Sequence, residues 1–287
     1  MSHTHGARRA LAALVTVVVL IGGGIVSTSA ASAAPALPVR MAAFGDSLSQ
    51  GIMTCSSLTS CTANSWSVGT TASVASHAAR LRAAGASLTT SNYAVTGAKS
   101  ANLSAQVTKA VTAGGALSVP QGPTYVTLQI GANDACTTTV AGMTPTATYE
   151  QNVRAAFAAV AASPAAPDIF VMSVPSIKRL WEVNRTSASA RWTWAILGLC
   201  RSMLANPSST SAVDMARRDA VQARVNEYNA VLARVCAETA KCWWDGGAVA
   251  NYSFAKADIS TRDYFHPSLA GQATVANITW AASQWVR

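Results

Sequence analysis

The residues best suited to chemistry in this sequence are one serine, one histidine and one aspartate. Ser47 follows a short apolar run and Gly45, which can adopt backbone angles that display a hydroxyl on a tight turn. A serine hydroxyl is a weak nucleophile until a base removes its proton. His266 is the candidate base, and Asp263 is close enough in the chain to hydrogen-bond one ring nitrogen, leaving the other for Ser47. The three residue types predict nucleophilic catalysis on an acyl group.

Attack of a serine on an ester forms a tetrahedral oxyanion, which needs hydrogen-bond donors already in place. The natural donors are the backbone N–H groups of Ser47 and Gly97 and the side-chain amide of Asn133. Gly97 carries no side chain that would obstruct its N–H. Asp46 and Asp134 stand beside two of these donors, and we expect them to bind nearby backbone groups instead of reacting.

Each of these residues also has a structural interpretation. Ser47 could cap a strand-to-helix turn, and Asn133 could simply form a turn. His266 could be a structural histidine at a helix entry, since Pro267 suits a first helical position. The other histidine beyond the N-terminal region, His77, lies in an alanine-rich stretch without a carboxylate motif. The functional interpretation is favoured because all the required groups occur in one chain.

The elements that must position these groups alternate between short apolar runs and longer helical segments. We expect strands at 39–44, 88–94, 125–130, 169–174 and 243–244, and helices at 66–84, 102–113, 146–162, 217–238 and 269–285. Strand followed by helix, repeated, predicts a parallel sheet covered on both faces. The predicted fold class is α/β: a three-layer doubly wound (flavodoxin-like) sheet of about five parallel strands. Functional groups in such sheets gather beyond the carboxyl ends of the strands.

Four blocks occur in order: Gly45-Asp46-Ser47-Leu48, Gly97, Gly131-Ala132-Asn133-Asp134 and Asp263-Tyr264-Phe265-His266. With them the chain resembles the SGNH, or GDSL, hydrolase superfamily from Met41 to the C-terminus. The resemblance implies a catalytic set of Ser47, Asp263 and His266 and an oxyanion hole of Ser47, Gly97 and Asn133, with no cofactor and no metal. The Tyr-Phe-His-Pro-Ser run resembles the phospholipase B-like and secreted actinobacterial lipase branches. Ala132 replaces the second glycine of the family's usual motif.

The first 34 residues have the organisation of a secretory signal peptide. Arg8 and Arg9 precede an apolar run at 10–25, and Ala31-Ser32-Ala33 matches an A-x-A cleavage signal. We expect residues 1–34 to be the signal peptide and residues 35–287 to be one SGNH hydrolase domain, secreted and extracellular. A retained membrane anchor is disfavoured because the apolar run is short against the roughly 20 residues that span a bilayer.

The six cysteines all follow the predicted cleavage site, so we expect disulfides. Many pairings are open from sequence alone. Proximity suggests Cys55–Cys61 and Cys236–Cys242, which leaves Cys136–Cys200. After residues 1–34 the chain has only two histidines, His77 and His266, beside the six cysteines. In an oxidising compartment this set argues against a metal cluster. A catalytic thiol is a weaker alternative than disulfides for the cysteines.

The charge of the chain bears on its partners. Without the first 34 residues the chain keeps 19 of its 21 basic residues against 12 acidic ones, a net charge of +7. Such a surface could favour anionic lipid or an acidic polymer, or could simply be solvated. Without a dense Lys/Arg run or a nucleic-acid motif, we expect no nucleic-acid partner. We expect a monomer with a small-molecule or lipid ester substrate and transient contact with a membrane surface.

The segment 178–215 is the least regular part of the sequence and carries Trp181, Trp192 and Trp194. It is interpreted either as an added helical layer with its own small core or as a wall that binds the acyl group of the substrate. A Cys136–Cys200 bridge would fix this segment beside the oxyanion hole.

Together these features predict a secreted serine carboxylester hydrolase, a lipase or esterase with phospholipase activity within its range, acting through an acyl-Ser47 intermediate. One alternative is a carbohydrate acetylesterase, which needs only a small acyl pocket. The other is a catalytically inactive envelope-binding protein on the same scaffold.

Overall fold

The structure, a computed structural model, describes residues 1–3, 36–56 and 58–286. The predicted cleavage site and almost all of the predicted signal peptide lie outside the described residues. All the elements below belong to the unit Pro35–Arg287. Among the described helices, none combines the length and the apolar character that a membrane crossing requires.

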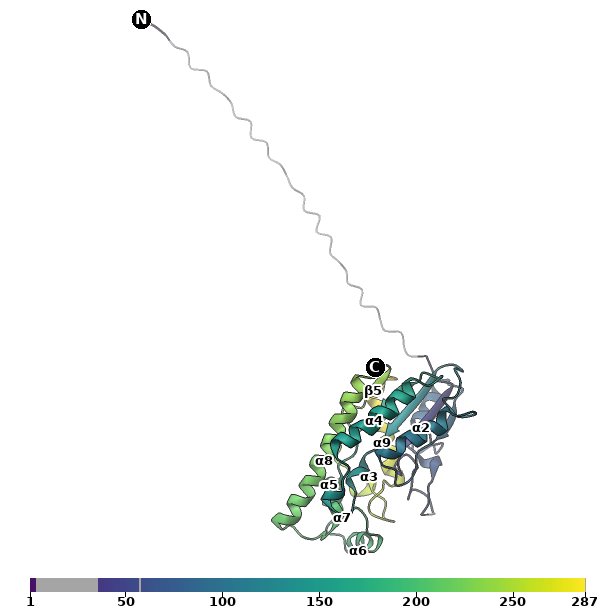
Figure 1. Ribbon diagram of the computed structural model, residues 1–287, viewed down its shortest axis with the longest axis vertical. Helices are drawn as coiled ribbons and strands as arrows, with labels where there is room; N and C mark the ends of the chain where they lie inside the picture. Colours follow the sequence, from purple (N-terminus) through teal and green to yellow (C-terminus); the bar gives the residue numbers. More distant parts are fainter. Residues whose placement is uncertain (4–35, 57, 287) are drawn as a thin grey trace. The chain divides into compact units, whose positions relative to one another are not determined.

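One sheet of five parallel strands organises the fold, in the order β2-β1-β3-β4-β5 (Figure 1). The strands are β1 (Arg40–Gly45), β2 (Thr89–Asn92), β3 (Thr124–Gln129), β4 (Asp168–Val171) and β5 (Cys242–Trp244). This is the predicted α/β class with the flavodoxin-like strand order. The carboxyl ends of all five strands therefore meet at one edge of the sheet.

Side chains of the strands alternate between two hydrophobic cores. In β1, Met41 and Ala43 pack with buried residues of α1 (His77–Ala83) and α9 (Leu269–Ala281). Ala42 and Phe44 face the opposite core, which is covered by α2 (Leu103–Val111), α4 (Thr146–Ala161) and α8 (Ala212–Ala237). Helix α4 lies between α2 and α8 (Figure 1). The predicted three-layer arrangement is confirmed.

The remaining helices follow the carboxyl ends of β3 and β4. Helix α3 (Ala132–Ala135) follows β3, and the segment after β4 forms α5 (Ile177–Asn184), α6 (Ala188–Leu197) and α7 (Arg201–Leu204). Short 3₁₀ turns occur at Thr62–Asn64, Ser100–Asn102, Val140–Gly142 and Lys256–Asp258. The segment expected to be irregular is thus an added helical layer.

The helix expected over 66–84 is shorter, because only His77–Ala83 is helical. Ser76 caps the helix by accepting a hydrogen bond from the Ala79 N–H, and Ala75 has a positive φ of 48° that no α-helix contains. The Trp66 N–H donates instead to the Gln272 side chain of α9. The alanine-rich composition of residues 66–84 predicts one long helix, but these contacts hold the first part of the segment in a non-helical conformation.

His77 is a core residue. Its ring is fully buried, and its two nitrogens lie 2.9 Å from the Tyr125 hydroxyl and 2.9 Å from the Thr279 hydroxyl. Burial, aided by the charge of Arg80, lowers its pKa to about 3, so this histidine stays neutral in the folded protein.

Two of the three predicted disulfides are present, Cys136–Cys200 and Cys236–Cys242. The predicted Cys55–Cys61 bridge is wrong for this structure, where the two side chains carry thiols. The Cys61 sulfur accepts a hydrogen bond from the Asn64 amide at 3.4 Å. Burial and the hydrogen bond to Cys55 raise the pKa of Cys61. The two cysteines are close in sequence and in space, but their sulfurs do not have the geometry that a disulfide bond requires.

Candidate active site

Ser47 lies directly after β1 on a turn that only glycine permits. Gly45 has a φ of 141°, and a Cβ at this position would lie 2.1 Å from the Gln129 carbonyl oxygen. The buried Gln106 side chain holds both backbone polar groups of Gly45, accepting from its N–H at 2.9 Å and donating to its carbonyl at 2.8 Å. The turn that presents the serine is therefore fixed from both sides.

The structure brings Ser47, His266 and Asp263 together in a hydrogen-bonded chain. The Ser47 Oγ lies 2.8 Å from His266 Nε2, and His266 Nδ1 lies 2.5 Å from Asp263 Oδ2. Asp263 Oδ1 also accepts from the N–H groups of Phe265 and His266. In this arrangement the imidazole can take the serine proton while the carboxylate fixes its tautomer and stabilises the imidazolium.

The charge state of Asp263 suits this arrangement. The side chain is almost fully buried, which by itself would raise its pKa. The hydrogen bond and charge of His266, with the two backbone N–H donors, outweigh burial and lower the pKa of Asp263 below its ordinary value. The carboxyl is therefore ionised at neutral pH.

The loop between Asp263 and His266 is held in a strained conformation. Tyr264 has a φ of 56°, in the left-handed region that non-glycine residues seldom adopt. Its carbonyl accepts a hydrogen bond at 3.1 Å from the indole Nε1 of the buried Trp194, and its N–H donates to the Ser260 carbonyl. Trp194 thus supports the loop that carries the histidine, a contact that sequence reasoning missed.

The three predicted oxyanion donors retain hydrogen-bonding capacity. Asn133 lies in α3, directly after β3, and its amide donates one hydrogen bond to the Ala98 carbonyl at 3.0 Å. This bond leaves its second N–H available and ties it to the residue next to Gly97. Within the described part of the chain, the N–H groups of Ser47 and Gly97 donate to no protein acceptor.

Asp46 and Asp134 bind neighbouring groups as predicted. Asp134 accepts from the Ser100 N–H at 2.9 Å and from the Ser100 hydroxyl at 2.7 Å. Asp46 accepts from the Leu48 N–H at 2.9 Å and from the Gln129 amide at 3.1 Å. These carboxyls join the loops that follow β1, β2 and β3.

The burial of Asp46 can be tested through the pH dependence of the protein's stability. Burial raises its pKa to about 6, opposed in part by the hydrogen bonds from Leu48 and Gln129. Because the folded pKa exceeds the unfolded value of about 3.9, ionised Asp46 destabilises the folded state above pH 6, and the penalty disappears as pH falls toward 4. We expect Asp46→Asn to gain stability relative to wild type as pH rises from about 4 to about 7, by on the order of 2 kcal/mol.

The measurement is urea unfolding of both proteins across this pH range. Asparagine keeps an acceptor for the Leu48 N–H, and its N–H₂ group can reach Gln129 Oε1, a buried oxygen without another partner, once the Gln129 amide rotates. A stability difference that stays constant over the whole range would show that Asp46 does not titrate there.

An apolar cleft that opens to solvent lies beside Ser47 and His266. Aliphatic and aromatic side chains dominate its lining, among them Pro175, Ile177, Leu180, Phe254, Ile259 and Phe265. Several of these follow the carboxyl end of β4 or precede His266, the regions of a parallel sheet where functional groups gather. The cleft can hold an apolar acyl chain next to the serine hydroxyl.

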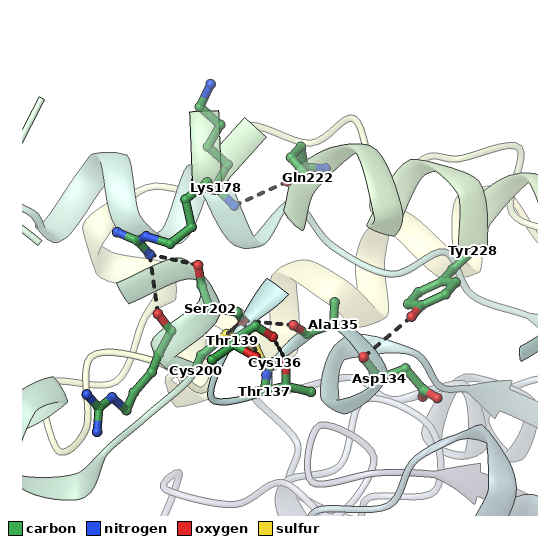
Figure 2. Close-up of a disulfide and its surroundings, with 12 residues drawn as sticks. Asp134, Ala135, Cys136, Thr137, Thr139, Lys178, Cys200, Ser202, Gln222 and Tyr228 are labelled. Atoms are coloured by element: carbon green, nitrogen blue, oxygen red, sulfur yellow. Dashed lines mark hydrogen bonds between the residues drawn. A yellow bond between two sulfur atoms is a disulfide. The ribbon is translucent and has the colours of Figure 1, made fainter. Parts of the chain in front are cut away.

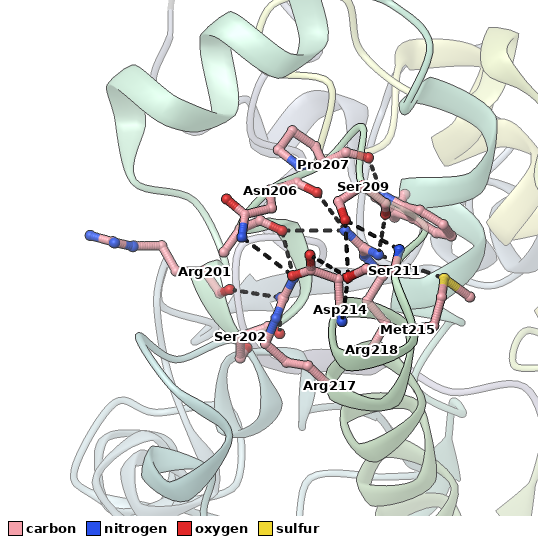
Figure 3. Close-up of polar contacts among 12 residues, drawn as sticks. Arg201, Ser202, Asn206, Pro207, Ser209, Ser211, Asp214, Met215, Arg217 and Arg218 are labelled. Carbon is pink, nitrogen blue, oxygen red and sulfur yellow. Dashed lines mark hydrogen bonds and ion pairs between the residues drawn. The ribbon is translucent and has the colours of Figure 1, made fainter.

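The structure does not place the predicted tryptophan wall at this cleft, because Trp181, Trp192 and Trp194 are all absent from its lining. Trp181 is buried and packs under the Arg218 guanidinium, 4.1 Å from its ring centroid. Its indole N–H donates to the Pro207 carbonyl, while Arg218 donates to carbonyls at 205–209 (Figure 3). Trp192 is exposed on α6. Two of the three therefore serve the core.

The Cys136–Cys200 bridge joins α3 to the start of α7 (Figure 2). Beside it, Ser202 Oγ donates to the Ala135 carbonyl at 2.9 Å and accepts from the Thr137 N–H at 3.2 Å. The added helical layer is thus fastened to the short helix that carries Asn133, as the sequence predicted for this bridge.

Comparison with known proteins adds a family to this geometry. The family model described as GDSL-like Lipase/Acylhydrolase matches residues 43–274. No curated protein matches the chain.

Three solved structures are similar to this chain at low sequence identity, and the first two, with TM-scores above 0.5, share its fold. An α/β hydrolase from the metagenome of Lake Arreo, Spain, is 19% identical, with a TM-score of 0.54 over 87% of this chain and 96% of that one. A catalytic mutant of an acetylxylan esterase from Geobacillus stearothermophilus is 16% identical, with a TM-score of 0.52 over 86% and 96%. An extracellular lipase from Streptomyces rimosus is 19% identical, with a TM-score of 0.49 over 85% and 100%.

Proposed function

The chain belongs to the GDSL-like lipase/acylhydrolase family and is a carboxylic ester hydrolase, and from this premise we propose that it cleaves esters of apolar acyl chains through an acyl-Ser47 intermediate. The observation that carries the proposal is the chain of contacts from Ser47 through His266 to Asp263, opening on an apolar cleft. The arrangement supplies a nucleophile, a base and an orienting carboxylate without further groups.

The proposed reaction has two halves. Ser47 Oγ bonds to the acyl carbon as its proton passes to His266 Nε2, and the oxyanion accepts hydrogen bonds from the N–H groups of Ser47 and Gly97 and from the Asn133 amide. The imidazolium then protonates the leaving alkoxide, the ester C–O bond breaks and the alcohol departs. Water repeats the sequence on the acyl-enzyme, releasing the carboxylic acid and restoring the Ser47 hydroxyl.

The lining of the cleft supports an acyl chain longer than acetyl. Ile177 and Leu180 come from α5, while Phe254 and Phe265 come from the loops on either side of the 3₁₀ turn before α9. An acetyl group would leave this apolar surface in contact with water, whereas an aliphatic chain would cover it. A carbohydrate acetylesterase needs no such surface.

Leu180 provides the test of this substrate class. We expect wild type to prefer soluble esters with longer acyl chains over the acetyl ester and over acetylated xylan. Leu180→Ala should lower kcat/KM for long acyl esters roughly tenfold, since each lost CH₂ contact is worth about 0.8 kcal/mol. The acetyl ester should change much less because its acyl group ends in a single methyl. The measurement is kcat/KM over a series from acetyl to palmitoyl esters.

Val183→Ala is the matched control, because Val183 is a half-buried aliphatic residue on the same helix that does not line the cleft. It should leave the chain-length profile unchanged. Faster cleavage of acetylated xylan than of any long-chain ester by wild type would make the acetylesterase the better assignment.

We also propose that the protein is exported. The charged, apolar and small-residue regions of 1–34 have the order of a signal peptide. The Cys136–Cys200 and Cys236–Cys242 bridges suit an oxidising compartment.

A further inference from the structure

Helix α6 has one face in the core and one in water. Ala190 and Trp194 are buried, and the Trp194 indole is bound to the Tyr264 carbonyl. Trp192 and Ile196 lie four residues apart, on the side of the helix opposite Trp194, and are 67% and 65% exposed. Leu197, at the end of the helix, is 53% exposed. These three exposed residues are together called the α6 outer face.

The α6 outer face is exposed on a firmly held helix. The Ser187 side chain caps α6 by accepting from the Ala190 N–H, and the Cys136–Cys200 bridge follows three residues after the helix ends. Trp194 binds α6 to the loop of Tyr264. The fold therefore keeps a tryptophan, an isoleucine and a leucine in water, where their apolar surface is unfavourable.

The segment that carries this face is basic. Residues 183–213 contain three arginines and no aspartate or glutamate, with acidic residues only directly before and after the segment. Arg185 lies over a buried tryptophan ring, and Arg191 donates to the Arg185 carbonyl. Arg201 is exposed and extends away from the polar cluster around Asp214 (Figure 3). Exposed tryptophan and aliphatic side chains accompanied by arginine are typical of helices that lie in the interface of anionic lipid.

We propose that the α6 outer face docks on an anionic lipid surface. Trp192, Ile196 and Leu197 enter the boundary between headgroups and acyl chains, and the exposed Arg201 binds a headgroup phosphate. This inference concerns binding and stands independently of the proposed hydrolysis.

The experiment is co-sedimentation with vesicles, using the chain from Pro35 onward, which contains both hydrophobic cores. Wild type should bind vesicles that contain phosphatidylglycerol more tightly than vesicles of phosphatidylcholine, and added salt should weaken this binding. The double variant Trp192→Ala/Ile196→Ala should lose more than tenfold in the vesicle partition coefficient, by the loss of roughly 25 cal/mol per Å² of buried apolar area. Arg201→Ala should weaken binding to the vesicles that contain phosphatidylglycerol and leave binding to the phosphatidylcholine vesicles unchanged.

Val286→Ala is the matched control, since Val286 is 54% exposed next to the C-terminus, at the opposite end of the fold from α6 (Figure 1). It should bind vesicles like wild type, and every variant should keep the wild-type melting temperature. Equal vesicle binding by wild type and a folded double variant would overturn the proposal. A wild-type dimer in light scattering that the double variant converts to a monomer would also overturn it, because the face would then join two copies of the chain.

Discussion

Replacing Ser47 with alanine should lower kcat for ester hydrolysis on the order of 10³-fold or more, with the protein still folded. The substitution removes the oxygen that we propose bonds to the acyl carbon, while the cleft and the proposed oxyanion donors remain. A residual rate above that of water alone should persist, because those donors still stabilise the oxyanion. The measurement is kcat on a soluble ester, with circular dichroism to confirm the fold.

Ser49→Ala is the matched control for this variant. Ser49 is fully buried two residues away, and its hydroxyl lacks a hydrogen-bond partner in the described structure. Its loss should therefore leave kcat near wild type. A fluorophosphonate should label wild type and Ser49→Ala but not Ser47→Ala. A wild-type protein that is not labelled would favour the inactive envelope-binding scaffold, and a Ser47→Ala variant with a tenth of wild-type turnover would exclude Ser47 as the nucleophile.

The convergence of the candidate site could be predicted because it follows from the topology of a parallel sheet. Ser47 follows β1 and Asn133 follows β3, and neighbouring strands in register deliver both to one edge. The proximity of Asp263 and His266 needed only three residues of chain. The pairing of Cys136 with Cys200 was predicted by pairing the cysteines closest in sequence first, which left these two. One of the pairs assigned by proximity, Cys55–Cys61, is nevertheless wrong.

The roles of the tryptophans could not be predicted from the sequence, because an apolar side chain can serve a core, a ligand or a surface. Trp181 lies under Arg218, Trp194 supports Tyr264 and Trp192 lies in water. Their different roles depend on the rotation of α5 and α6 about their axes, which is set by packing. The role of Gln106, which holds the turn before Ser47, could not be predicted either, because its partners are backbone atoms distant in sequence.

Replacing Asp263 with asparagine should lower kcat by on the order of 10³- to 10⁴-fold and leave KM close to wild type. The lowered pKa of Asp263 means that an anion normally accepts the proton of His266 Nδ1. An asparagine amide can instead donate to Nδ1, which places the ring proton on Nε2, facing Ser47, where it cannot accept the serine proton. KM should hold because the residues that line the cleft are untouched.

Asp245→Asn is the matched control for Asp263→Asn. Asp245 is also buried and accepts from the N–H groups of Ser173 and Gly247, but it lies outside the hydrogen-bonded chain of Ser47, His266 and Asp263. That variant should lose stability without a comparable loss of kcat. If Asp263→Asn kept kcat within tenfold of wild type in a folded protein, another group would have to orient His266, and the assignment of this carboxylate would fail.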